Sequence, residues 1–463
     1  MTQVSSVTHA ISINPATGEQ IGHYPFQSAS DLDAALARAA AGFSVWRRTP
    51  VEQRAQALVV LARTLRDNAA TMANMISVEM GKPVTQARGE IEKCAQLCEW
   101  YAEHGPAMLT AEPTLVEGGK ARIEYRPLGP ILAVMPWNFP IWQVLRGAVP
   151  ALIAGNTYVL KHAPNVMGSA YLLRDALQRA NLPEGVFEVI NVTPDGVSTA
   201  IADPRIAAVT LTGSVRAGMA IGAQAGAAMK KCVLELGGSD PFIVLNDADL
   251  DEAVKAAVIG RYQNTGQVCA AAKRLIVEQG IVEEFTRKFV EATRQLVVGD
   301  PLAADTYIGP MARFDLRDEL DQQVRDTLEE GATLLLGGKK AEGPGNYYEP
   351  TVFADVTDQM TSFKQELFGP VASIITARDA AHALALANDS EFGLASTIYT
   401  RNVELAQQMA GELETGGVFI NGYCASDPRV TFGGVKKSGF GRELSHFGVR
   451  EFCNAQTVWL DRR

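Results

Sequence analysis

The stretch ILAVMPWNFP, residues 131–140, marks the point where the chain adopts a repeating order of strand, loop and helix. Residues 131–134 form a continuous apolar run, which is typical of a strand buried on both faces of a sheet. Comparable runs follow, with helical segments between them, at residues 157–161, 187–191 and 208–211. Strands that alternate with helices predict a parallel sheet covered by helices, and such sheets bind ligands beyond the carboxyl ends of their strands.

The remaining segments extend this α/β pattern in both directions. A second series begins near Glu235, with strands expected at 242–245, 274–277, 373–375 and 418–420 and helices at 249–262, 282–296, 316–330, 380–388 and 403–413. Earlier in the chain we expect an extended segment at 12–27 and three helices within 31–108. Residues 115–127 alternate between apolar and polar side chains, as a half-buried strand does, and residues 451–460 also resemble a strand.

Composition indicates a globular protein and excludes several kinds of partner. The 463 residues suffice for two or three domains. A net charge of −10, with scattered lysines and arginines, argues against nucleic acid or an anionic membrane as a partner. The six cysteines show no disulfide pattern and the N-terminus shows no signal-peptide pattern, so we expect a cytoplasmic protein. The histidines show no paired spacing, so we expect no metal site.

Cys269 lies in the stretch NTGQVCAAAKR, residues 264–274, among small and polar side chains. Small neighbours leave room for a carbonyl carbon above the thiol, and a positive local field would favour the thiolate. Gly266 permits a tight turn or a close backbone approach. The residues therefore favour a nucleophile, although a buried cysteine that packs as a small apolar side chain is the alternative.

Asn138 and Glu235 also occupy strand ends. The Asn138 amide could donate to a developing oxyanion, or could satisfy the backbone of a turn. Glu235 stands between leucines in LELGG, where burial would raise the pKa of its carboxyl toward that of a base working near neutral pH. Its alternative role is an ion pair with a nearby cation.

Two further strand ends suggest contacts with a nucleotide. Lys161 ends a strand and could reach a ribose hydroxyl or a phosphate, unless it is simply solvated. Gly213 allows close backbone approach, and Ser214 can cap a helix whose N-terminus attracts phosphate. The segment matches neither the G-x-G-x-x-G fingerprint nor a Walker loop, so it is a weak signal by itself.

The ordered series PWNFP, LTGS, LELGG, GQVC, ELFGP and FGGVKKSGFGRE resembles the aldehyde dehydrogenase superfamily over nearly the whole chain. The resemblance implies an α/β fold with a Rossmann-type cofactor domain at residues 1–114 and 128–235 and a catalytic domain at 236–440. A β oligomerisation flap would combine residues 115–127 and 441–463. Because pairing with another subunit would cover the open edges of such strands, we expect a homodimer or homotetramer.

The resemblance also assigns roles to individual residues. Cys269 would be the nucleophile, the Asn138 amide and the Cys269 backbone N–H would hold the oxyanion, and Glu235 would activate the water that hydrolyses a thioester. The residues implied in binding NAD or NADP are Trp137, Lys161, Gly213, Ser214, Leu236, Glu366 and Phe368. NAD-preferring relatives usually carry a glutamate three residues after the lysine, where this chain has Pro164. Without a carboxylate to repel a 2′-phosphate, we expect both cofactors to serve.

The residues flanking these motifs resemble those of succinate-semialdehyde dehydrogenases, which implies oxidation of succinate semialdehyde or a similar small aldehyde. Arg146 and Ser426 match carboxylate-binding positions, and Gln263 stands where many members have a second arginine. Arg146 could instead form a salt bridge on a helix surface. Ala271 replaces a second cysteine found in some relatives, so we expect no redox-switch disulfide there.

Three other functions compete with this one. They are oxidation of another small aliphatic aldehyde, transfer of the thioester to coenzyme A, and cofactor binding without catalysis. Acylating relatives generally lack the glutamate present at position 235, which argues against transfer to coenzyme A. The presence of Cys269, Asn138 and Glu235 together disfavours a non-catalytic protein.

Overall fold

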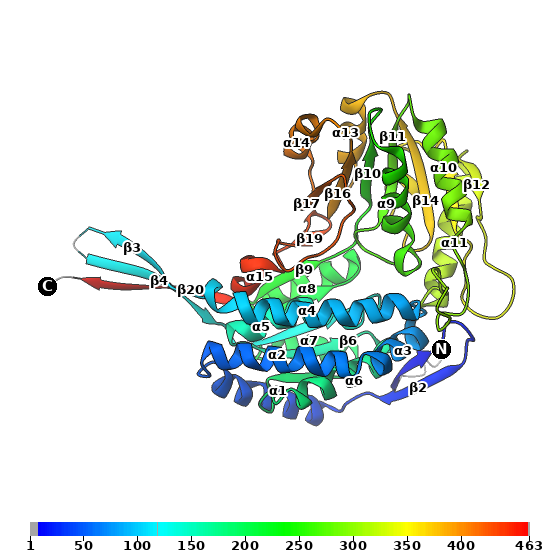
Figure 1. Ribbon diagram of the computed structural model, residues 1–463. Coiled ribbons are helices and arrows are strands. Elements are labelled where there is room, and N and C mark those ends of the chain that lie inside the picture. Colours follow the sequence, from blue (N-terminus) through cyan, green and yellow to red (C-terminus); the bar gives the residue numbers. More distant parts are fainter. Residues whose placement is uncertain (1–7, 118, 462–463) are drawn as a thin grey trace.

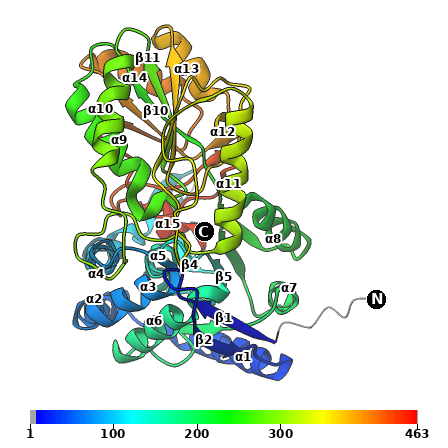
Figure 2. The ribbon, with the colours of Figure 1, turned by 90° about the vertical axis from the view of Figure 1, so that its right-hand side faces the viewer.

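Two α/β units and a projecting arm make up the computed structural model, which describes residues 8–117 and 119–461 (Figure 1). The three domains expected from the sequence also include residues 1–7, 118 and 462–463, which lie outside the described residues. One unit is built mainly from the N-terminal half and the other mainly from the C-terminal half, and the two are stacked in Figure 2.

The first sheet has the strand order β19-β9-β8-β5-β6-β7. Its bounds are β5 Pro130–Met135, β6 Thr157–His162, β7 Phe187–Ile190, β8 Ala208–Thr212, β9 Lys231–Glu235 and β19 Gly439–Phe440. The strands β5 to β9 are parallel, with Val134 opposite both Lys161 and Leu211. Their carboxyl ends therefore meet at one edge, as the apolar runs in the sequence predicted.

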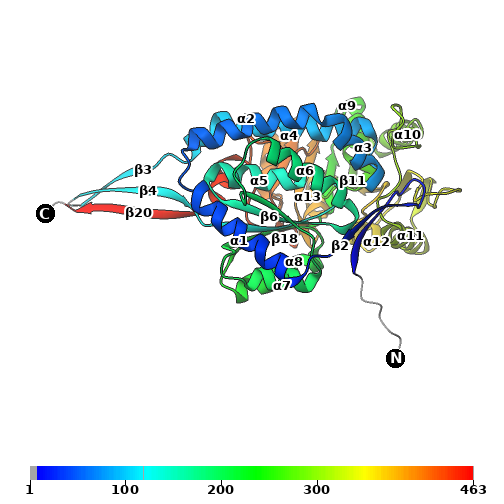
Figure 3. The same cartoon turned by 90° about the horizontal axis from the view of Figure 1, so that it is seen from below.

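Helices cover both faces of this sheet. Leu132 packs with α1, α7 and α8, whereas its neighbours Ile131 and Ala133 pack with the helices α2 to α6, because successive side chains of a strand point to opposite faces. Figure 3 shows α2 and α4 on one side and α7 and α8 on the other. The bounds are α1 Ala29–Trp46, α2 Val51–Asp67, α3 Ala69–Met80, α4 Val84–Met108, α5 Trp142–Ala154, α6 Met167–Arg179, α7 Pro194–Ala202 and α8 Val215–Ala227.

The N-terminal helices differ from the sequence prediction. The described residues 29–108 contain four helices rather than three. Gly81, at φ 78°, ends α3, and Pro83 precedes the start of α4, so one helical stretch divides in two. The extended segment expected at 12–27 is the antiparallel pair β1 His9–Ile13 and β2 Gln20–Pro25.

The second sheet has the order β12-β13-β14-β11-β10-β16-β17. Its bounds are β10 Asp240–Val244, β11 Ala272–Glu278, β12 Thr333–Leu336, β13 Thr351–Ala354, β14 Val371–Ala377, β16 Ala395–Tyr399 and β17 Gly417–Ile420. The sequence did not predict β12, β13 or β16. The covering helices are α9 Leu250–Tyr262, α10 Val282–Arg294, α11 Phe314–Glu329, α12 Thr361–Lys364, α13 Ala380–Asn388 and α14 Val403–Glu412. The short elements η2 Gln263–Gly266, β15 Phe392–Gly393 and β18 Val435–Lys436 complete this unit, whereas η1 Pro164–Val166 follows β6 in the first unit.

The arm consists of β3 Glu112–Val116, β4 Gly119–Pro127 and β20 Cys453–Asp461, in the order β20-β4-β3 (Figure 1). The single strand expected at 115–127 is wrong at its start, because residues 115 and 116 belong to β3 and β4 begins at Gly119. The strand β4 pairs antiparallel with β20, which was expected at 451–460, from Cys453 opposite Pro127 to Asp461 opposite Gly119. The segment 441–463 also contains α15, Ser445–Glu451, which packs against α5 in the first unit. None of the helices within the described residues is both long and apolar enough to cross a bilayer.

Candidate active site

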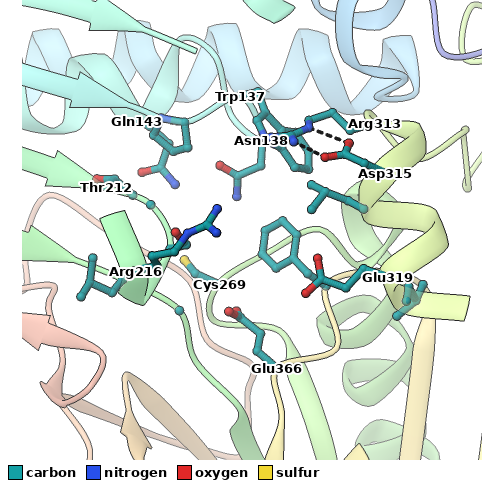
Figure 4. A pocket seen from close by; sticks show the side chains of 18 of the residues that line it. Trp137, Asn138, Gln143, Thr212, Arg216, Cys269, Arg313, Asp315, Glu319 and Glu366 are labelled. Atoms are coloured by element: carbon teal, nitrogen blue, oxygen red, sulfur yellow. Dashed lines mark hydrogen bonds and ion pairs between the residues drawn. The ribbon is translucent and has the colours of Figure 1, made fainter. Parts of the chain in front are cut away.

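A pocket of about 600 Å³ lies between the carboxyl edge of the first sheet and the second unit. Asn138 follows β5, Thr212 ends β8, and Cys269 comes from the loop before β11, so loops of both units meet there (Figure 4). The helix α11 closes one side with Glu319 and Gln323. This volume falls in the range of small-molecule and cofactor sites, as expected for the edge of a parallel sheet.

An unusual backbone presents Cys269. Asn264, Thr265 and Gly266 have φ of 53°, 56° and 71°, so three successive residues are left-handed. A Cβ on Gly266 would lie 2.2 Å from the carbonyl oxygen of Gly369, so only glycine fits this close approach. The Asn264 side chain donates to the backbone oxygens of Asn138 (2.8 Å) and Gln267 (3.3 Å). The loop that carries the thiol is thereby fastened to the loop that carries Asn138.

The Asn138 amide faces the same cavity as the Cys269 thiol (Figure 4). Its Nδ2 donates to the carbonyl oxygen of Gln267 at 3.0 Å. An amide nitrogen carries two hydrogens, so one N–H remains for an oxygen in the pocket. His162 holds this loop from beneath, with Nε2 2.8 Å from the Pro140 oxygen.

Burial raises the pKa of the Cys269 thiol to about 11, against the opposing effect of the Arg146 and Lys273 charges. Lys273 is fully buried; its Nζ donates to the Cys269 carbonyl oxygen at 2.6 Å and pairs with Glu366 at 3.0 Å. The positive field expected from the sequence is present, but desolvation of the thiolate outweighs it. Forming the thiolate at neutral pH therefore requires a base or a change of surroundings on ligand binding.

Glu235 ends β9 and is 2% exposed. Neither carboxylate oxygen has a hydrogen-bond partner within residues 8–117 and 119–461. Burial, opposed by Arg146 and reinforced by Glu443, raises the pKa of Glu235 to about 8. A Cβ on Gly433 would lie 2.8 Å from Glu235 Oε1, so a glycine leaves the carboxylate its space. An unpartnered carboxylate with such a pKa can take a proton from water near neutral pH.

Most residues predicted to bind a cofactor line the same pocket: Trp137, Gly213, Ser214, Leu236, Glu366 and Phe368. The Trp137 and Phe368 rings meet edge to face, with centroids 5.8 Å apart. Ser214 caps α8, its hydroxyl accepting from the Ala217 N–H at 3.3 Å. Lys161 lies at the end of β6, next to β5, and is outside the lining of this pocket.

The predicted substrate residues are less uniform. The Arg146 guanidinium is buried, pairs through Nε with the Glu443 carboxylate and lies 4.5 Å from the centre of the Phe432 ring. The expected alternative of a surface salt bridge is wrong, because both partners are buried. The Ser426 hydroxyl accepts a hydrogen bond from Lys93. Gln263 is exposed and does not line the pocket.

The sequence reasoning missed several charged residues around this site. Lys273 is the lysine of GQVCAAAKR, and Glu443 is the last residue of FGGVKKSGFGRE, so both belong to quoted motifs and could have been found. Arg216 also lines the pocket and follows Ser214 of LTGS by two residues, whereas Arg313 lines the pocket from a segment that no motif marks. Among the described residues, no group of three or more histidine, cysteine or acidic side chains is arranged to hold a metal ion. All six cysteines are free thiols.

The chain is similar to known proteins along its whole length. The Aldehyde dehydrogenase family profile matches residues 2–458. The succinate semialdehyde dehydrogenase (NAD(P)+) Sad of Escherichia coli K12 is 66% identical over 459 residues, 99% of each chain. The succinate-semialdehyde dehydrogenase (NADP+) of Mycobacterium avium is 48% identical over 452 residues, 97% of this chain and 96% of that one.

A solved structure agrees with these sequence matches. The succinic semialdehyde dehydrogenase of Streptococcus pyogenes, in complex with NADP+, superposes with a TM-score of 0.96 at 35% identity, over 98% of this chain and 100% of that one. The expected α/β fold of this superfamily is therefore confirmed. With its motifs in order, a matching fold and relatives aligned end to end, the chain belongs to the aldehyde dehydrogenase family.

Proposed function

We propose that this enzyme oxidises succinate semialdehyde to succinate with NAD or NADP, through a thioester on Cys269. The observation that carries the proposal is the shared pocket: the Cys269 thiol and the Asn138 amide face one cavity of cofactor size. The unpartnered Glu235 carboxylate adds a base, and the E. coli and M. avium relatives are named for this substrate.

The pocket suits a nicotinamide dinucleotide. Gly213 and Ser214 lie at the N-terminus of α8, where backbone N–H groups and the helix dipole favour phosphate, and Arg216 adds a positive charge. A Cβ on Gly237 would lie 2.2 Å from Glu366 Oε2, so glycine keeps this carboxylate close to the backbone and available for a ribose hydroxyl. When bound, such a cofactor accepts the hydride whose loss converts the thiohemiacetal into a thioester.

The residues of the chain perform the remaining work. The thiolate of Cys269 attacks the aldehyde carbon, and the free Asn138 N–H and the Cys269 backbone N–H hold the oxygen as it gains charge. Glu235 then removes a proton from the water that attacks the acyl carbon, and Cys269 leaves as thiolate. With a pKa of about 8, Glu235 is both protonated and ionised in appreciable amounts near neutral pH.

We infer that both cofactors are accepted. Pro164 opens η1 directly after β6, at the position where the resemblance places a glutamate in NAD-preferring relatives. A proline brings no charge to repel a 2′-phosphate. The E. coli relative is named for NAD(P)+ and the M. avium relative for NADP+.

We further propose a cytoplasmic homodimer or homotetramer assembled through the arm. Three apolar side chains on its strands are exposed: Leu115 by 89%, Trp459 by 55% and Leu460 by 68%. Exposing apolar side chains and open strand edges to water is unfavourable, and burial against another subunit would remove this free-energy cost. Light scattering of the purified protein tests this point, and a stable monomer at working concentration opposes it.

A panel of aldehydes assayed with each nicotinamide tests the proposed activity. The expected result is a kcat/KM for succinate semialdehyde well above that for butanal, which has the same carbon count but no distal carboxylate. If the kcat/KM for butanal is equal or higher, the proposed substrate is wrong and the enzyme acts on an uncharged aldehyde instead. No NADH from any aldehyde, despite cofactor binding, would indicate a non-catalytic protein.

A further inference from the structure

Lys93, on α4, is a cation that the proposed mechanism does not use. Its Nζ donates to the Ser426 hydroxyl at 3.0 Å and lies 4.0 Å from the centre of the Trp142 ring. The acidic side chains that influence it are engaged elsewhere, since Glu90 pairs with Lys82 and Asp427 with Arg429. Within the described part of the chain, Lys93 itself forms no salt bridge with a carboxylate.

The position of Lys93 is fixed by the packing of α4 on α5. Glu90, one turn earlier on α4, accepts hydrogen bonds from the backbone N–H groups of Ile141 (2.9 Å) and Trp142 (3.0 Å). This contact sets the start of α5 against α4 and places the Trp142 ring beneath the ammonium group. A lysine held over an aromatic ring and stripped of most water offers a strong, localised positive charge.

Lys93 adjoins the residues expected to recognise the substrate. Ser426 is its direct partner, and Arg146 follows Trp142 by one helical turn on α5. The pKa of Cys424, two residues before Ser426, is raised by burial and by Cys269 and lowered by Lys93. The segment that carries Ser426 is therefore in contact with the lysine and feels the charge of the nucleophile.

The two other positions that the resemblance assigns to the carboxylate end of the substrate supply less free charge than Lys93. The charge of Arg146 is balanced by the buried Glu443 carboxylate, which occupies its Nε, although its Nη2 has no hydrogen-bond partner among the described residues. Position 263, where the resemblance places a second arginine in many relatives, is an exposed, neutral glutamine. A dianionic product or an anionic substrate therefore needs a positive charge from another element.

We propose that Lys93, together with Ser426, binds the distal carboxylate of the aldehyde and so sets the preference for a semialdehyde over an uncharged aldehyde. The inference rests on the proposed function and names a specificity residue for it. Lys93 supplies the positive charge that Gln263 lacks. The Trp142 ring packs against its ammonium group, and the Ser426 hydroxyl can donate a second hydrogen bond to the carboxylate.

Substituting Lys93 separates this role from a structural one. Lys93→Met keeps the apolar stem over Trp142 but removes the charge, Lys93→Arg keeps the charge, and Lys255→Met removes an exposed lysine of α9 as a control. We expect Lys93→Met to lower kcat/KM for succinate semialdehyde by about 10- to 100-fold, as for a hydrogen bond to a charged group. The value for butanal should stay within about twofold, and Lys93→Arg and Lys255→Met should retain the wild-type preference.

Two failures can be told apart. If the wild-type enzyme shows no preference for succinate semialdehyde, the proposed substrate is wrong. If the wild-type preference exists and survives in Lys93→Met, within about threefold in the ratio of the two kcat/KM values, only the role of Lys93 is overturned. A parallel loss on both aldehydes leaves that ratio unchanged and likewise overturns it.

The pH dependence of this ratio gives an independent readout. Burial lowers the pKa of Lys93 to about 8, with the Arg146 charge acting in the same direction. The charged and titratable groups around it are Glu90 and Cys94 on α4, Arg146 on α5, and Cys424 and Asp427 on the loop that carries Ser426. Both aldehydes depend on Cys269 and Glu235, so the titration of those two groups cancels in the ratio. The preference should fall as pH rises through about 8 in the wild type and stay constant in Lys93→Arg. An identical fall in Lys93→Arg contradicts the assignment.

Discussion

Replacing Glu235 by glutamine should stop the enzyme after one turnover. The side chain keeps its size and its place at the end of β9 but can no longer accept a proton. At pH 7 a carboxyl with a pKa of about 8 is ionised in roughly a tenth of molecules, and at pH 9 in roughly nine tenths. Loss of a general base costs about 10²- to 10⁴-fold, so hydrolysis of the thioester becomes the slow step.

The assay combines rapid mixing with mass spectrometry. Glu235→Gln mixed with NAD and succinate semialdehyde should release a burst of about one NADH per active site. The protein should then carry the mass of one succinyl group on the peptide that contains Cys269. In the wild type, the rate of acyl-enzyme hydrolysis should rise from pH 7 to pH 9, because the pKa of Glu235 is raised and its ionised fraction grows over this range.

Unfolding cannot explain the expected loss. The pKa of Glu235 is raised from 4.5 in the unfolded chain to about 8 in the folded protein. Because the unfolded chain loses this proton first, the free energy of unfolding falls as pH rises from about 4.5 through about 8. Glutamine removes that effect, and the Tm of Glu235→Gln at pH 7 should equal or exceed that of the wild type. Glu252→Gln, an exposed change on α9, is the matched control and should turn over normally. Steady turnover by Glu235→Gln within tenfold of wild type, or the absence of acyl mass on Cys269, would refute the reasoning.

Three further predictions concern the same site. Asn138→Ala should lower kcat/KM about 10²- to 10³-fold on charged and uncharged aldehydes alike, because it removes an oxyanion donor. Steady-state kinetics on both substrates check this, and a loss on one substrate alone would contradict it. Arg146→Ala should lower the free energy of unfolding by about 3–5 kcal/mol, because it leaves the buried Glu443 carboxylate without its partner. Urea denaturation measures this, and adding Glu443→Gln to the Arg146→Ala variant should recover part of the loss. Saturation kinetics should give NADP at least about a thousandth of the kcat/KM of NAD, a gap under roughly 4 kcal/mol, and a larger gap would show that Pro164 does not permit both cofactors.

The order of strands and helices followed from local sequence for most of the elements that are buried on both sides. The apolar runs at 131–134, 157–161 and 208–211 became β5, β6 and β8, because a parallel strand between two helical layers must be apolar throughout. The short strands β12, β13 and β16 escaped notice. The strand β12 lies at the edge of its sheet and is partly exposed, which weakens its apolar pattern. The interior strand β16 has five buried residues, as the predicted β8 has, so neither length nor burial explains why it was missed.

The family of this protein and the residues expected to carry its chemistry can be read from the amino-acid order alone, because motifs such as PWNFP and GQVC are contiguous. Which charges meet depends on the folded arrangement of distant segments. Lys93 and Ser426 are separated by 333 positions, and Arg146 and Glu443 by 297, and each pair forms because separate elements pack together at that place. Whether a charge is neutralised or remains available to a substrate depends on these long-range contacts, which no local pattern encodes.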